Sequence, residues 1–113
     1  MFSLFEQERR SCKRVATEFD LTYGPTPEEQ SMTTGMEISE CGLRFRSNGD
    51  LSFDARVYVR LMVNSADLPD LIEATVKHIN SDIVGIEFTK VPSSSKAVIA
   101  QIIESSAPPE PQP

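Results

Sequence analysis

Short runs of alternating apolar and polar residues restrict the fold of this sequence more than any other feature. The run VATEFDLTY places Val15, Thr17, Phe19, Leu21 and Tyr23 at every second position. A period of two sends one face of a β-strand toward a core, whereas a helix repeats its apolar positions every three or four residues. The first regular element is therefore predicted to be a strand.

Five further runs have strand character and are separated by turn residues. After the turn SNGD, the segment DARVYVRLMV alternates inward residues with residues of the other face; the inward set is Val57, Val59, Leu61 and Val63. The other predicted strands cover residues 33–38, 43–46, 71–79 and 83–91. The last two are expected to form an antiparallel pair that closes the sheet. Between the second and third strands, Gly42 is suited to a tight or positive-φ bend.

The period changes only toward the end of the sequence. Ser93 to Ser95 can cap a helix in which Val98 and Ile102 lie four residues apart on one apolar stripe. We expect this stripe to cover an open barrel end, and the alternative is a partner-binding face. The Pro-rich residues 104–113 are predicted to be a disordered tail.

The length of 113 residues suits one core, so we expect one domain over residues 8–103 after a flexible segment 1–7. No run approaches the roughly 18 to 20 apolar residues of a membrane-spanning helix. The start MFSLFEQE also lacks the parts of a signal peptide. We therefore expect a cytoplasmic protein without membrane insertion, either a monomer or a weak homodimer.

The charge is negative overall but uneven along the chain. The net charge of -6 and the pI of about 4.7 argue against DNA or RNA binding, which normally needs a basic surface. Yet residues 1–14 carry four basic side chains against two acidic ones. This local positive pole on an acidic body indicates a smaller anionic ligand.

The sequence offers little for metal binding or catalysis. Cys12, Cys41 and the single histidine, His78, cannot complete a four-ligand zinc site, and no nucleophile–base pair is visible. His78 lies in a predicted strand and is expected to be structural or exposed. We expect no enzyme activity, no metal and no cofactor.

The positive pole is concentrated in ERRSCKR, which contains Arg9 and the pattern R-x-x-x-R at Arg10 and Arg14. A guanidinium can bind phosphate bidentately, bond the O6 and N7 edge of guanine, or stack on a base. Lys13 offers only a point charge and is expected to be a bystander. Taken alone, such a cluster is more often a solvated charged terminus than a binding site.

A second motif lies in MEISECGLRF, where Glu37, Ser39 and Gly42 form the pattern acidic-x-Ser-x-x-Gly. A carboxylate can accept from the N1–H and N2–H₂ groups of guanine, a hydroxyl can donate to phosphate, and a glycine lets the backbone approach closely. Taken alone, this is also what a polar hairpin looks like. The two motifs together indicate a guanine nucleotide site.

The succession of RRSCKR, EISECGLRF, the VYVRLMV strand and VGIEF before a helix resembles the PilZ domain, the bacterial receptor module for cyclic di-GMP. The resemblance extends from about Glu8 to Ile103. It implies an all-β fold with a C-terminal helix, a six-stranded antiparallel barrel. The strands read from periodicity agree with that fold.

Carried over by position, the resemblance implies that Arg10 and Arg14 grip guanine bases and phosphates, while Glu37, Ser39 and Gly42 form the floor of the site. The family motif has Asp or Asn where this chain has Glu37. The extra methylene moves the carboxylate by about 1.5 Å, roughly one carbon–carbon bond. This departure bears on affinity more than on fold.

Arg9 precedes R-x-x-x-R, and in similar proteins a basic residue there accompanies binding of an intercalated cyclic di-GMP dimer. The expected function is a stand-alone receptor in which the ligand orders residues 6–14 and an unidentified downstream protein reads the change. The alternative is a ligand-independent adaptor in pilus or flagellar control. The presence of the arginines argues against that alternative, and the substitution at Glu37 argues for it.

Cys12 lies inside the first motif and Cys41 inside the second. If the terminal segment folds over the barrel, the sulfurs could approach and allow gating by oxidation. Cytoplasmic thiols are normally kept reduced, and sequence cannot show the Cα separation that a disulfide requires. We therefore expect two reduced thiols.

Overall fold

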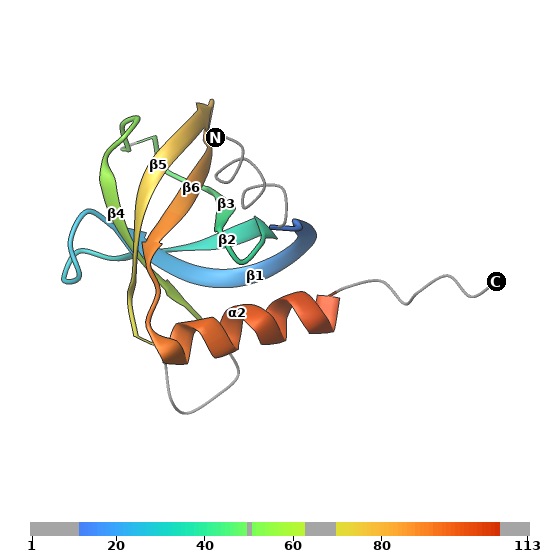
Figure 1. The fold of residues 1–113 in the computed structure, drawn as a ribbon. Helices are drawn as coiled ribbons and strands as arrows, with labels where there is room; N and C mark the ends of the chain where they lie inside the picture. The colour runs from blue at the N-terminus through green and yellow to red at the C-terminus, as the bar shows by residue number, and fades with distance from the viewer. Residues whose placement is uncertain (1–11, 50, 63–69, 107–113) are drawn as a thin grey trace, which may run out of the picture.

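Six antiparallel strands close into a barrel, and one helix lies against it (Figure 1). The structure, a computed structural model, describes residues 12–49, 51–62 and 70–106. The strands are β1 (Val15–Gly24), β2 (Ser31–Ile38), β3 (Gly42–Arg46), β4 (Arg56–Leu61), β5 (Ile72–Asn80) and β6 (Ile83–Lys90), and the helix is α2 (Ser93–Ser106). The predicted fold, a six-stranded barrel with a C-terminal helix, is confirmed.

The strand order around the barrel is β1-β2-β3-β6-β5-β4. The predicted antiparallel pair of the last two strands is present as β5 and β6. The barrel, however, closes where β1 pairs with β4, from Leu21 opposite Leu61 to Gly24 opposite Tyr58. Because the ring is closed, each strand has two neighbours, and β6 pairs with β3 as well as with β5.

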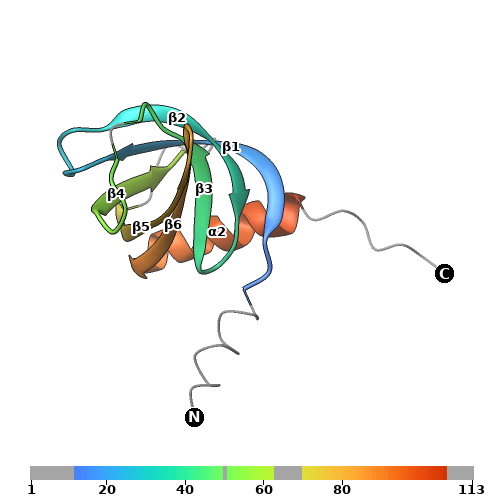
Figure 2. The same ribbon diagram turned by 90° about the horizontal axis from the view of Figure 1, so that it is seen from above.

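Strand β1 follows its predicted alternation along its length, with the deepest burial in its second half. Phe19, Leu21 and Tyr23 are buried in the core, whereas Val15 and Thr17 are only partly buried. The register against β2 shifts between Ala16 and Phe19, which is the signature of a bulge. A bulge bends its strand, and Figure 2 shows β1 curving strongly along its length. The predicted strand and its alternation are therefore confirmed.

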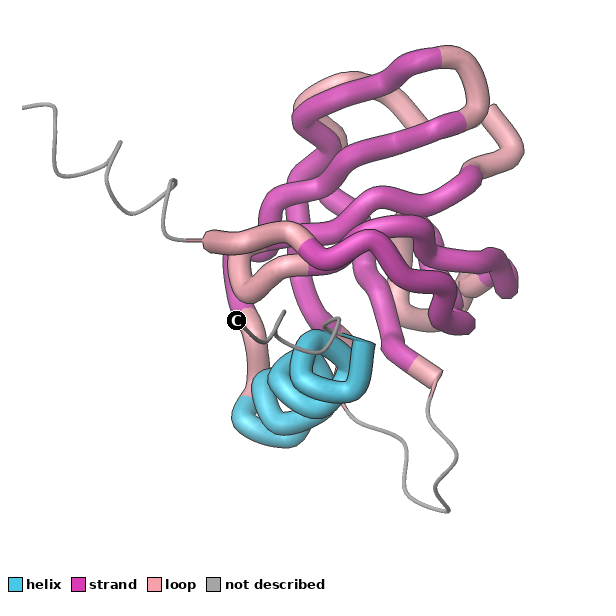
Figure 3. The backbone as a smooth tube through the Cα atoms, turned by 90° about the vertical axis from the view of Figure 1, so that its right-hand side faces the viewer, coloured by secondary structure: helices cyan, strands magenta, loops and turns pink. Residues whose placement is uncertain are grey.

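Helix α2 covers one end of the barrel, as the apolar stripe predicts (Figure 3). Ile99 is part of the core, and Val98, Ile102 and Ile103 pack against it. The helix ends at Ser106, so residues 104–106 of the expected tail belong to it. Within the described residues, no helix has both the length and the apolar character needed to cross a membrane.

The serines at the start of α2 bond to the chain that precedes β5. The Asp70 amide donates to the Ser94 hydroxyl over 3.0 Å, and the buried Ser95 hydroxyl donates to the Asp70 carbonyl over 2.5 Å. The first helical turn is closed by the Pro92 carbonyl, which accepts from the amides of Ser95 and Lys96. The hydroxyl groups of these two serines thus fasten the helix to the chain before β5.

Candidate functional site

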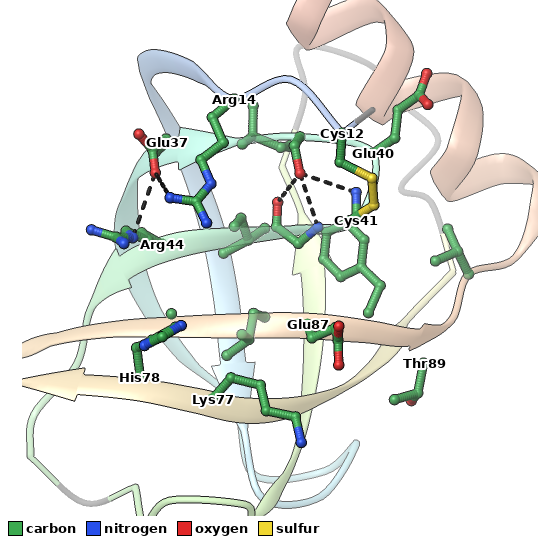
Figure 4. A pocket seen from close by; sticks show the side chains of 18 of the residues that line it. Cys12, Arg14, Glu37, Glu40, Cys41, Arg44, Lys77, His78, Glu87 and Thr89 are labelled. Carbon is green, nitrogen blue, oxygen red and sulfur yellow. Dashed lines mark hydrogen bonds and ion pairs between the residues drawn. A yellow bond between two sulfur atoms is a disulfide. The ribbon is translucent and has the colours of Figure 1, made fainter. Parts of the chain in front are cut away.

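A broad pocket of about 1010 Å³ lies on the outer surface of the barrel, across β2, β3, β6 and β5. Both predicted motifs reach it, since its lining includes Arg14, Glu37, Ser39 and Gly42. Figure 4 shows Glu37 and Arg44 at one end, Cys12 and Cys41 at the other, and β6 running beneath. Side chains from four strands and from the chain before β1 therefore face one space.

Ser39 organises the loop between β2 and β3. It is only 5% exposed, and its amide donates to the Gly42 carbonyl over 2.8 Å. Its hydroxyl oxygen accepts from the amides of Cys41 and Gly42 over 3.0 and 3.2 Å, and donates to the Gly42 carbonyl over 3.3 Å. A serine hydroxyl that bonds nearby backbone in this way holds a tight turn. The Ser39 hydroxyl therefore holds the loop between β2 and β3.

Gly42 is required by the close approach of β6. It pairs with Glu87, and a Cβ at Gly42 would collide with the carbonyl oxygen of Ile86. A backbone atom cannot move aside as a side-chain tip can, so the position excludes a side chain. Gly42 thus belongs to the tight turn that was expected here, and its lack of a side chain serves the approach of β6. A positive φ occurs instead at Gly49, after β3.

Two arginines share the carboxylate of Glu37. Its Oε1 lies 3.5 Å from Nε of Arg44 and 3.9 Å from an Nη of Arg14. The Glu37 side chain is 28% exposed, against 43% for Arg44 and 60% for Arg14. Pairs of this length at partly exposed sites are weakly held. The Glu37 carboxylate therefore has acceptor capacity that another donor can reach.

Strand register extends this group into a row across the sheet. Glu37 on β2 faces Arg44 on β3, Arg44 faces Gly85 on β6, and Gly85 faces His78 on β5. Because Gly85 has no side chain, the row has a gap between Arg44 and His78. A Cβ added there would lie 3.3 Å from Cβ of His78. Gly85 itself is buried, and the side chains of Arg44 and His78, which carry planar groups, flank it.

The lining of the pocket is mixed in charge. Among its described residues, Arg14, Arg44, Lys77 and Lys96 are cationic, and three carboxylates are contributed by Glu37, Glu40 and Glu87. Lys77 is drawn aside by Asp54, whose Oδ1 lies 3.4 Å from Nζ. The part of the chain that the structure describes contains no group of three or more His, Cys, Asp and Glu side chains able to hold a metal ion. The pocket therefore suits a ligand that has both anionic groups and hydrogen-bond donors.

Cys12 and Cys41 are joined by a disulfide at the edge of the pocket. Their Cα atoms lie 5.8 Å apart, although 29 positions separate them in the sequence. The expectation of two reduced thiols is therefore not met in this structure. The register explains the proximity, because Val15 pairs with Ile38 and thereby leads the preceding chain past the loop that holds Cys41.

The structure brings together four of the six predicted site residues. Arg14, Glu37, Ser39 and Gly42 line one pocket. Arg9 and Arg10 lie outside the described residues. His78, expected to be structural or exposed, is exposed and lines the pocket.

Sequence reasoning missed Arg44 as a neighbour of Glu37. The signal was present, because Ile38 and Leu43 are the inward residues that close the hairpin, so that Glu37 and Arg44 must both point outward beside each other. Gly85 and His78 had no comparable local signal. Their place depends on the pairing of β3 with β6, which joins segments far apart in the chain.

A model of the PilZ domain matches residues 8–105, nearly the whole chain. The chain belongs to the PilZ domain family. PilZ domains are cyclic di-GMP binding and adaptor modules rather than enzymes. A comparison with curated protein sequences finds no match.

Solved structures confirm the PilZ fold. The inhibitor of motility MotI/DgrA of Bacillus subtilis superimposes with a TM-score of 0.65 at 20% identity, covering 86% of this chain and 50% of that protein. The PilZ domain of YcgR from Escherichia coli, solved with c-di-GMP, gives 0.65 at 12% identity over 87% of this chain and 91% of its own. The PilZ domain of CeSA from a cellulose-synthesizing bacterium gives 0.63 at 10% identity, over 82% and 96%. The chain thus spans half the length of MotI/DgrA and most of each isolated PilZ domain.

Proposed function

We propose that this PilZ domain is a cytoplasmic receptor for cyclic di-GMP, which it binds between the R-x-x-x-R motif and the hairpin of β2 and β3. The observation that supports this most is the meeting of Arg14 with Glu37 at one pocket, 3.9 Å apart. These residues come from two motifs that are distant in the sequence. A PilZ domain that had lost its ligand site would have no need to keep them together.

The chemistry of the pocket matches the two parts of the ligand. The Glu37 carboxylate can accept from guanine N1–H and N2–H₂, while Arg14 can bond a phosphate or the O6 and N7 edge of the base. In this proposal the ligand replaces the long Arg14–Glu37 pair with shorter bonds to each partner. Arg44, 3.5 Å from Glu37, keeps the carboxylate oriented.

The floor of the pocket suits a flat base. Gly42 and Gly85 line the pocket on neighbouring strands and place no side chain in it, and Ser39 holds the loop beside Gly42. The volume of about 1010 Å³ is at the upper end of ordinary ligand pockets, which is roomy enough for more than one base. This supports the further proposal, made from Arg9, that two intercalated cyclic di-GMP molecules bind.

Signalling would follow from the position of the arginines at the start of the domain. We propose that the ligand orders residues 6–14 against the barrel and so creates a surface that a downstream protein reads. The barrel is fixed by its closed ring of strands, so the change is confined to the segment that contacts the ligand.

Titration calorimetry with cyclic di-GMP tests the receptor proposal. We expect the parent protein to bind with measurable heat, and the double variant Arg10→Ala, Arg14→Ala to lose about a hundredfold or more in affinity, because each charge-assisted bond contributes about 1.5 to 3 kcal/mol. Arg46→Ala is the matched control. Arg46 lies on β3 but pairs with Asp82 outside the pocket, so its loss should change affinity by less than about twofold.

Two results would contradict the receptor proposal or its site assignment separately. No heat at high micromolar ligand would contradict the receptor proposal and favour the alternative, a ligand-independent adaptor. That alternative draws on one observation, namely that Glu37 is longer than the family's Asp or Asn and already faces two arginines. Parent-like binding by the double variant would contradict the assignment of the site but not the function.

A further inference from the structure

We propose that Cys12 and Cys41 form a reversible disulfide that sets the affinity of the pocket according to redox conditions. Oxidation fastens the chain before β1 to the loop between β2 and β3, and reduction releases it. The inference rests on the proposed function for its effect on ligand affinity, whereas the disulfide itself is assigned independently of any ligand.

The backbone is arranged for the bond. The Cα separation of 5.8 Å lies within the 4.4 to 6.8 Å that disulfides span without moving the chain. Cys41 is held on both sides, since its amide donates to the Ser39 hydroxyl over 3.0 Å and its carbonyl accepts from the Phe88 amide over 2.8 Å. Cys41 is therefore a fixed anchor on the barrel, and Cys12 belongs to the segment that it holds.

The bond acts in the middle of the arginine motif. Cys12 stands two residues before Arg14 and two after Arg10. With Cys12 fastened to Cys41, the Arg14 guanidinium is within 3.9 Å of Glu37. In the reduced protein, only a fraction of the molecules hold the chain around Cys12 in the arrangement that binds the ligand, and the apparent affinity is lowered by that fraction. The disulfide holds this arrangement before the ligand arrives and so removes the cost. The oxidised form is therefore the form with higher affinity.

A small-molecule disulfide, such as oxidised glutathione, supplies the oxidising equivalents. One cysteine thiolate attacks a sulfur of this disulfide and expels one thiolate, and the second cysteine then attacks the mixed disulfide and expels the other. Two electrons pass to the reagent, and the two cysteine protons end on the two thiols released. Both cysteines line the open pocket and are only partly buried, so the reagent can reach them.

The location favours a switch over a structural brace. The core is formed by apolar side chains from the strands and from α2, and neither cysteine belongs to it. The strands next to the two cysteines, β1, β2 and β3, are held by backbone pairing that does not depend on the disulfide. Breaking the disulfide thus removes a constraint on the chain before β1, which carries Arg14, and leaves the barrel intact.

The test compares protein equilibrated with oxidised glutathione and protein kept in dithiothreitol. Mass spectrometry under denaturing conditions should find the oxidised monomer lighter by two hydrogen atoms and without free thiols. Calorimetry should then give an affinity for cyclic di-GMP about tenfold higher for the oxidised protein, the ratio expected when about a tenth of reduced molecules are competent. Cys12→Ser and Cys41→Ser should each bind like the reduced parent under both conditions.

A ligand-free measurement separates this inference from the proposed function. Trypsin cleavage after Lys13 and Arg14, followed on reducing gels, should be slower in the oxidised parent and independent of redox conditions in Cys12→Ser. Thiols that stay free, a bridge between two chains, or equal affinity in the two states with the bridge formed would overturn the inference alone. Absence of binding in both states, with the bridge formed and the segment protected, would overturn the receptor proposal and leave the disulfide assignment standing.

Discussion

The helix-covered end of the barrel and the pocket on its outer surface are built by opposite means. At the covered end, Ile99 is 3% exposed and packs with apolar strand residues. In the pocket, Arg14, Glu37 and Arg44 are partly exposed, and their ion pairs are 3.5 and 3.9 Å long. Apolar burial contributes strongly to stability, whereas exposed pairs of charges contribute little.

This contrast assigns stability and recognition to different parts of one small domain. Side chains of the pocket can be exchanged without unfolding the barrel, because the closed ring of strands and the helix hold it. Conversely, the core residues that pack against α2 can affect ligand binding only through the stability of the fold. A variant at the covered end should therefore change stability alone, and a variant of a pocket side chain should change affinity alone. Gly42, which serves both strand packing and the pocket, should change both.

Ile99→Ala should have the largest effect, and on stability alone. Removing a buried isoleucine side chain should lower the free energy of unfolding by about 3 kcal/mol in urea denaturation, since such truncations cost about 2 to 5 kcal/mol. Gln101→Ala, an exposed position on the same helix, should change it by less than about 0.5 kcal/mol. Ligand affinity measured under folded conditions should stay within twofold of the parent value. A tenfold loss of affinity would show that α2 and the pocket are coupled.

Gly42→Ala should affect both properties and so mark the boundary between the two regions. Its methyl group would meet the Ile86 carbonyl and push β6 away from β3. The expected cost is about 2 kcal/mol of unfolding free energy, typical of overpacking, with at least a tenfold loss of cyclic di-GMP affinity. Denaturation and calorimetry on the same preparation measure the two. Loss of binding at unchanged stability would mean that the glycine serves ligand access and not strand packing.

Glu37→Asp should have the smallest effect on stability, less than about 0.5 kcal/mol, because it only weakens partly exposed ion pairs. The shorter side chain withdraws the carboxylate from Arg14 and Arg44 and restores the residue type of the family motif. Calorimetry should therefore find cyclic di-GMP binding that is equal or tighter. Clearly weaker binding would refute the view that Glu37 is a compromised version of the motif.

Much of this molecule could be predicted from its sequence because the relevant signals are local. The alternation of Leu21 and Tyr23, or of Val57 and Val59, identifies strands without knowledge of their partners. The stripe on α2 likewise predicts a covering helix. In the same way, acidic-x-Ser-x-x-Gly predicts a tight polar loop, and Ser39 forms it through bonds that span three residues.

What the sequence did not predict depends on contacts between distant segments. The closing pair of β1 and β4, the gap at Gly85 and the approach of Cys12 to Cys41 all follow from strand register. For the last of these, the pairing of Val15 with Ile38 directs the preceding chain toward the loop that holds Cys41. No periodicity within β1 specifies that direction, and side-chain chemistry alone does not determine which strand ends meet.

The closed ring of strands also limits how a downstream protein can recognise this domain. A sheet with a free edge can accept an added strand from another chain, with affinity supplied by backbone hydrogen bonds. Here every described strand is hydrogen-bonded to a neighbour on each side. Where strands are paired on both sides, recognition of the barrel wall must therefore proceed through side chains, so that selectivity for a partner resides in the identity of exposed residues and can be changed one residue at a time.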